Sequence, residues 1–150
     1  MKNKLVASFL VIGLAFLGFS YLEKASDNCV NLYIDYGLLD NSTKIEQCIK
    51  VSTETNALEI LKTAGYTVEG TQKYGDAVVC RLNGLPDKSA ETCEVMPPEN
   101  AFWAVIVKEK KLFLLFDEWG WAQTGINEIQ LSKGDSLGLV FSTNGDLKWP

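Results

Sequence analysis

Apolar and polar residues alternate along much of the chain with the period of two that is typical of β-strands. The clearest case is residues 30–36, where Val30, Leu32, Ile34 and Tyr36 fall on one side and the residues between them on the other. This pattern predicts a half-buried strand. Further strands are predicted at residues 45–51, 66–70, 77–82, 102–107, 111–116, 117–123, 128–131 and 137–141.

One segment has helical spacing instead. Ser52-Thr53 offers an N-cap, and Gly65 suits the left-handed position that often follows the last helical residue. Together with the apolar spacing, these signals predict an amphipathic helix over residues 54–64, about three turns long. The apolar positions are Ala57, Leu58, Leu61 and Ala64.

The order of these elements indicates the fold class. Two strands come first, one helix follows, and the remaining elements are strands separated by turns such as Asn83-Gly84 and Lys133-Gly134-Asp135. This order predicts an α+β domain in which a mostly antiparallel sheet packs one face against one helix. Strands interrupted by a single crossing helix form the outline of a β-grasp.

The N-terminal segment indicates export. Lys2 and Lys4 precede an uncharged apolar run at residues 5–22, the arrangement of a secretory signal peptide. Gly18 and Ser20 place small residues correctly for cleavage after Ser20. The run is also long enough to anchor the chain in a membrane without cleavage. Residues 1–28 are therefore a signal peptide or an anchor, and residues 29–150 an extracytoplasmic domain.

Four cysteines follow, at Cys29, Cys48, Cys80 and Cys93. An even number of cysteines in an oxidising compartment predicts two disulfides, and four cysteines permit three pairings. The pairing that closes short loops is Cys29–Cys48 with Cys80–Cys93, and the second bridge would brace the loop beside Trp103. The sequence lacks the C-x-x-C spacing of zinc sites and the histidine partner of most catalytic thiols.

Several short motifs resemble a known family, the transcobalamin C-terminal-like β-grasp domain, most closely small secreted bacterial proteins of this type. The similarity covers about residues 29–141. The resemblance implies a β-grasp fold and a small-ligand surface; vitamin B12 carriers complete their corrin site with a large helical domain, which this sequence lacks. The motifs are Asn56-Ala57-Leu58, Ala64-Gly65-Tyr66, Cys80-Arg81-Leu82-Asn83-Gly84-Leu85-Pro86, Phe102-Trp103 and Lys133-Gly134-Asp135.

Composition excludes several function classes. A net charge of −5 without a basic cluster argues against a nucleic-acid partner. The absence of histidine removes Ser-His-Asp and Cys-His catalytic sets and histidine metal sites. Carboxylates are numerous, but their spacing singles out no catalytic pair and no calcium loop. We therefore expect no enzyme, no cofactor and no metal.

The aromatic residues are the best candidates for function. Trp119 and Trp121 would share one strand face and could form a shelf for a flat ligand or for a partner's side chain, and Trp103 is a third candidate. Tyr36 and Tyr74 add to the aromatic surface. The sequence thus predicts an exported binding module for a small planar ligand or an envelope protein. The alternative is a structural or interaction domain of the cell envelope, held at the membrane by residues 5–22.

Overall fold

The structure, a computed structural model, describes residues 28–41, 43–108, 118–144, 147 and 149–150. The predicted signal peptide or anchor therefore lies outside the described residues, apart from its last residue, and so does the strand predicted at residues 111–116. None of the helices within the described part of the chain has the length and apolar character needed to span a bilayer.

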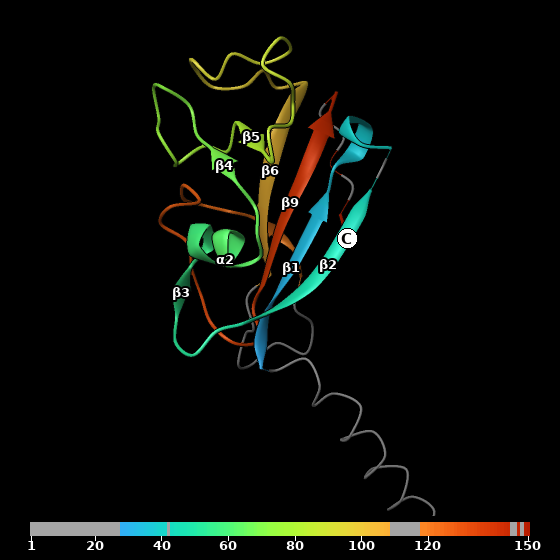
Figure 1. The fold of residues 1–150 in the computed structure, drawn as a ribbon. Coiled ribbons are helices and arrows are strands. Elements are labelled where there is room, and N and C mark those ends of the chain that lie inside the picture. The colour runs from blue at the N-terminus through green and yellow to red at the C-terminus, as the bar shows by residue number, and fades with distance from the viewer. Residues whose placement is uncertain (1–27, 42, 109–117, 145–146, 148) are drawn as a thin grey trace, which may run out of the picture.

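A mixed five-stranded sheet occupies the centre of the domain (Figure 1). Its strands are β1 (Cys29–Asp35), β2 (Lys44–Lys50), β6 (Ala101–Lys108), β7 (Gly120–Trp121) and β9 (Ser136–Thr143). They lie in the order β2-β1-β9-β6-β7. β1 and β9 pair in parallel, and the other neighbours are antiparallel. Over the part of the chain that the structure describes, the prediction of an α+β domain with one α-helix is confirmed.

The first strand is more deeply buried than a half-buried strand should be. Val30, Leu32 and Ile34 face the core, as predicted, but Tyr33 and Asp35 on the other face are buried as well. The reason is that β1 lies inside the sheet, between β2 and β9. The buried carboxylate of Asp35 is compensated by an ion pair with Lys44, whose Nζ lies 3.1 Å from Oδ2.

The one α-helix among the described residues, α2 (Ala57–Thr63), begins later than the predicted residue 54. Asn56, rather than Ser52 or Thr53, caps it: the Asn56 side-chain oxygen accepts a hydrogen bond from the Leu58 amide. The reason is pairing, because Thr55 and Asn56 form the short strand β3 (Thr55–Asn56), which is hydrogen-bonded to β8 (Gln130–Leu131).

The end of the helix is as predicted. Gly65 has a φ of +89°, and the Gly65 and Tyr66 amides donate to the carbonyls of Lys62 and Leu61. This pair of hydrogen bonds is the Schellman arrangement, which depends on a residue that tolerates the left-handed conformation. It turns the chain from α2 toward the next strand.

A second two-stranded sheet, besides the pair β3–β8, connects the helix to the disulfide loop. It pairs β4 (Val68–Glu69) with β5 (Arg81–Leu82), so the strand predicted at residues 77–82 is shorter than expected. The predicted Asn83-Gly84 turn is confirmed. Both residues have positive φ, 51° and 80°, and Leu82 and Leu85 exchange two backbone hydrogen bonds across them. These are the features of a tight hairpin turn.

The core lies between α2 and one face of the sheet, which we call the inner face. Ala57, Ile60 and Leu61 of α2 are fully buried in the same cluster as the inner-face side chains of β1 and β9. The opposite side of the sheet, called the outer face here, carries a second and smaller buried cluster of Tyr33, Ile106 and Val140.

Both disulfides have the pairing favoured by locality, Cys29–Cys48 and Cys80–Cys93. The first joins neighbouring strands β1 and β2, and the second closes the loop after β5. Their sequence separations are 19 and 13 residues. Loops of this size contribute about 3 kcal/mol each to stability in the chain-entropy description.

We predict that loss of either bridge lowers the melting temperature by roughly 10 °C, the shift that about 3 kcal/mol produces in a domain of this size. The measurement is thermal unfolding followed by circular dichroism for Cys29→Ala/Cys48→Ala and for Cys80→Ala/Cys93→Ala. The variant lacking all four cysteines controls for direct effects of reductant. A wild-type melting temperature that is the same with and without reductant would contradict the prediction.

Candidate functional site

Trp103 is a residue of the core. Only 4% of its surface is exposed, and it makes edge contacts with Tyr36 and Phe141, each with ring centroids 5.4 Å apart. Its indole Nε1 donates to the Leu85 carbonyl at 3.0 Å. Burial also raises the pKa of the Tyr36 hydroxyl. Trp103 can therefore offer only a small part of its ring to a ligand.

Trp119 and Trp121 lie on the outer face, on the side of the sheet opposite to Trp103. Trp121 pairs with Ile106 across β6 and β7, and its ring stacks on Phe102 with centroids 6.3 Å apart and planes inclined by 26°. Trp119 contacts Tyr33, with centroids 6.3 Å apart. The structure thus separates the three tryptophans that the sequence singled out into a buried one and an outer pair.

Trp149 also belongs to this surface, although no periodic pattern in the sequence predicts it. Its ring meets Trp121 edge-on, with centroids 6.0 Å apart, and 45% of each of these two side chains is exposed. Leu147, nearby in the chain, packs against the outer-face cluster. The aromatic residues Tyr33, Phe102, Trp119, Trp121 and Trp149 are called the outer aromatic face below.

A glycine in β9 allows Trp119 to lie on the sheet. A Cβ atom added at Gly138 would come within 2.5 Å of the Ile106 side chain and 3.1 Å of the Trp119 ring. No side chain can be accommodated there without moving its neighbours. Gly138 therefore provides the shallow position on which the Trp119 ring is seated.

A cavity of about 430 Å³ adjoins Trp119 on this face. Its lining combines two aromatic rings with amide and carboxylate groups, which can orient a small ligand by hydrogen bonds. Six of its residues are Asn31, Tyr33, Glu46, Gln47, Trp119 and Pro150.

The positively charged side chain of Lys44 lies beside Tyr33 at the outer aromatic face. The ammonium of Lys44 is 5.9 Å from the Tyr33 ring centre and forms the ion pair with Asp35. Hydrogen bonds with the Tyr33 hydroxyl and the Asp35 carboxylate raise the pKa of Lys44. The lysine is held by these two partners and is a positive group beside the aromatic surface.

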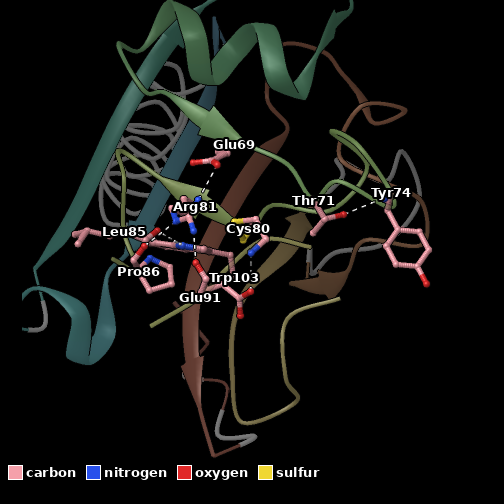
Figure 2. The surroundings of a disulfide bond; sticks show 10 residues. Glu69, Thr71, Tyr74, Cys80, Arg81, Leu85, Pro86, Glu91 and Trp103 are labelled. Atoms are coloured by element: carbon pink, nitrogen blue, oxygen red, sulfur yellow. Dashed lines mark hydrogen bonds and ion pairs between the residues drawn. A yellow bond between two sulfur atoms is a disulfide. The ribbon is translucent and has the colours of Figure 1, made fainter. Parts of the chain in front are cut away.

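The loop closed by Cys80–Cys93 has a structural organisation. Figure 2 shows Arg81, next to the disulfide, directed toward Glu69 on one side and toward the loop backbone on the other. Arg81 Nη1 lies 2.6 Å from Glu69 Oε1, and its Nε donates to the Pro86 carbonyl at 3.1 Å. Nη2 donates to the Glu91 carbonyl. One buried guanidinium thus joins β4 to both ends of this loop segment.

Two carboxylates near the loop, Glu69 and Asp87, have pKa values below their ordinary values because of nearby hydrogen-bond donors. The hydrogen bond from Arg81 lowers the pKa of Glu69. Hydrogen bonds from the Ser89 amide and hydroxyl lower the pKa of Asp87. A general acid at neutral pH needs a raised pKa instead. The structural hydrogen bonds of both carboxylates therefore account for their lowered pKa values.

One group of potential metal ligands occurs among the described residues, Cys80, Glu91 and Cys93, whose ligand atoms lie within 4.8 Å of one another. Both sulfur atoms belong to the disulfide, which removes the thiolates that a metal would need.

Tyr74, which the sequence suggested as part of an aromatic surface, is exposed in the loop before Cys80, and the Lys73 ammonium lies 5.1 Å from its ring centre. It is part of neither the core nor the outer aromatic face.

Comparison with known proteins adds no relative. The chain matches no family model, and no curated protein or solved structure is significantly similar to it.

We predict that Glu69→Gln makes stability less dependent on acid pH. Because Arg81 lowers the Glu69 pKa below its ordinary value of 4.5, the ion pair stabilises the fold fully above about pH 4.5. This contribution is lost as the pH falls through the lower pKa of the folded state. The melting temperature of Glu69→Gln should therefore be lower than wild type at pH 7 and approach it at pH 3.

The matched control is Glu54→Gln, which removes one carboxylate from an exposed position before α2. It should leave the slope of melting temperature against pH close to that of wild type. An acid profile of Glu69→Gln that runs parallel to the wild-type profile would show that the pair with Arg81 does not contribute to stability.

Proposed function

We propose that the chain is an exported, non-enzymatic binding module of the β-grasp type that holds a small flat ligand on its outer aromatic face. The observation that carries this proposal is the environment of Trp121, which is stacked on Phe102 and flanked by Trp149 while 45% of its surface remains exposed. A large ring that is both positioned and accessible gives contact area with little loss of side-chain freedom on binding.

The β-grasp assignment is supported by the topology. The first and the last strand, β1 and β9, pair in parallel inside the sheet, and α2 covers the inner face (Figure 1). Each of these strands has an antiparallel neighbour on its other side. This arrangement also agrees with the resemblance to transcobalamin C-terminal-like domains, which remains a prediction from short motifs.

Export is supported by the cysteines. The two disulfides are consistent with an extracytoplasmic location, where an oxidising environment allows them to persist. The N-terminal segment with Lys2, Lys4 and the apolar run remains the sequence evidence for the route.

The chemistry of the outer face favours a flat molecule that also carries polar groups. Aromatic rings bind the faces of planar systems and of sugar rings, and the adjoining cavity is lined by Asn31 and Glu46, which can form hydrogen bonds. A side chain of a protein partner is the other occupant that such a surface suits. The two occupants differ in the contact area they need, so the size of a bound molecule distinguishes them.

We predict that Trp121→Ala weakens binding of a flat ligand about tenfold, the effect of removing a central aromatic contact. The probes are a panel of corrins, haems and glycans, with binding measured by tryptophan fluorescence and calorimetry. Leu38→Ala is the matched control, because it removes a highly exposed apolar side chain from the turn η2 (Gly37–Leu39). Fluorescence that no probe changes would contradict the flat-ligand proposal.

The alternative, a membrane-anchored structural domain, depends on whether residues 5–22 are retained. We predict cleavage after Ser20, so that the mature protein begins at Tyr21 and is recovered without detergent. N-terminal sequencing and fractionation of the native protein measure this. Recovery of an intact N-terminus in the membrane fraction would favour the anchored domain instead.

A further inference from the structure

A second cavity, of about 360 Å³, opens along β6, and Phe102 of the outer aromatic face is one of the residues that line it. Trp103 and Val105, which face the same way as the core, form one wall. Most of the remaining lining is apolar and includes Val78, Met96 and Pro97, whereas Glu99 contributes a carboxylate. The volume falls within the range of sites for small organic molecules.

The other walls come from the two segments that the Cys80–Cys93 disulfide joins. Residues 77–79 directly precede Cys80, and residues 96–99 follow Cys93 closely. Backbone hydrogen bonds hold each segment: the Ile126 amide donates to the Ala77 carbonyl at 3.1 Å, and the Ala101 amide donates to the Pro98 carbonyl at 3.0 Å. The cavity is therefore formed before any ligand arrives, which lowers the cost of binding.

Met96 gives this wall a surface that a ligand could cover. Although Met96 lines the cavity, 59% of its surface is exposed. A methionine side chain is flexible and polarisable, so it adapts to apolar ligands of different shape. Together with Val78 and the small exposed part of Trp103, it offers contacts suited to a hydrocarbon or aromatic skeleton.

The charge of the lining determines which polar group such a ligand would carry. Glu99 is the one ionisable side chain among the nine residues that line the cavity. A carboxylate in an otherwise uncharged lining attracts a cation through its own charge. A calcium ion is not suited, because it needs six or more oxygen ligands. An anionic ligand would be repelled by Glu99 and by the net charge of −5.

We propose that this cavity binds a small organic amine, with its apolar skeleton between Val78, Met96 and Trp103 and its ammonium beside Glu99. The Cys80–Cys93 disulfide fixes the distance between the walls. Phe102 lines this cavity and also stacks on Trp121, so the site borders the outer aromatic face through this one side chain, while Trp121 itself does not line it.

The test uses phenethylamine as the probe and follows the full-length mature domain by two-dimensional NMR. The expected result is saturable shifts at the Ala77 and Val79 amides and at the Trp103 indole N–H, which is hydrogen-bonded to Leu85. The neutral analogue 2-phenylethanol should bind about two- to fivefold more weakly, the effect of an ion pair in contact with solvent. The anionic analogue 3-phenylpropanoate should bind more weakly still.

Glu99→Gln should remove the preference for the amine over the alcohol. Glu94→Gln, which removes a carboxylate from an exposed position in the same loop but outside the cavity lining, should preserve it. Equal affinities of wild type for the amine and the acid, or an equal effect of the two variants, would overturn the proposal. Shifts centred on Tyr33 and Trp119 would overturn it as well, because they would place the amine on the outer face.

Removing each disulfide in turn tests whether the Cys80–Cys93 bridge holds the cavity walls in place. Cys80→Ala/Cys93→Ala should weaken binding of both the amine and the alcohol at a temperature where the variant is folded. Cys29→Ala/Cys48→Ala removes a bridge between β1 and β2, which do not line this cavity, and should leave both affinities unchanged. Affinities that respond equally to the two double variants would show that the Cys80–Cys93 bridge does not hold the walls.

Discussion

The parallel pairing of β1 with β9 is the interaction on which the rest of the structure depends. It joins the beginning of the domain to its end over five residue pairs, from Asn31–Ser136 to Asp35–Val140. A parallel pair cannot be closed by a tight turn, so the intervening chain must cross the sheet, and here α2 crosses the inner face. The same register sets Tyr33 beside Gly138, and that pair forms the shallow surface on which Trp119 lies.

Much of this architecture could be predicted from local patterns. The strand β1, the Asn83-Gly84 turn and Gly65 at the end of α2 were indicated by local signals, and the structure confirms each of them, although both faces of β1 are buried. Predictions failed where a distant partner decided the outcome. The helix begins after Asn56 because Thr55 and Asn56 pair with β8 as a strand. β8 lies more than seventy residues away in the sequence. Its pairing leaves no trace in the local pattern.

The outer aromatic face and the second cavity likewise combine features that local sequence patterns predict with features that depend on distant contacts. The spacing of Trp119 and Trp121 was sufficient to suggest a shared face, since alternate residues of a strand point the same way. The contributions of Phe102 and Trp149 depend on how β6 and β7 meet Leu147 and Trp149, which is a matter of tertiary contact. For Trp103 the sequence already favoured a role in covering the sheet or bracing the disulfide loop, without giving the partner that buries it. The register of β6 against β9 places it in the core beside Phe141.

Adjacent residues of β6 connect the two surfaces. Phe102 supports Trp121 on the outer face, while Trp103 borders the cavity on the inner side and is fixed by its hydrogen bond to Leu85. Because Leu85 belongs to the segment that Arg81 and the Cys80–Cys93 bridge hold in place, the loop positions Trp103 as well as the cavity wall. A compact loop with few apolar residues of its own needs such covalent and buried polar constraints, since it has little hydrophobic burial to order it. The disulfide loop therefore holds in place, through its geometry, the side chains that line the second cavity.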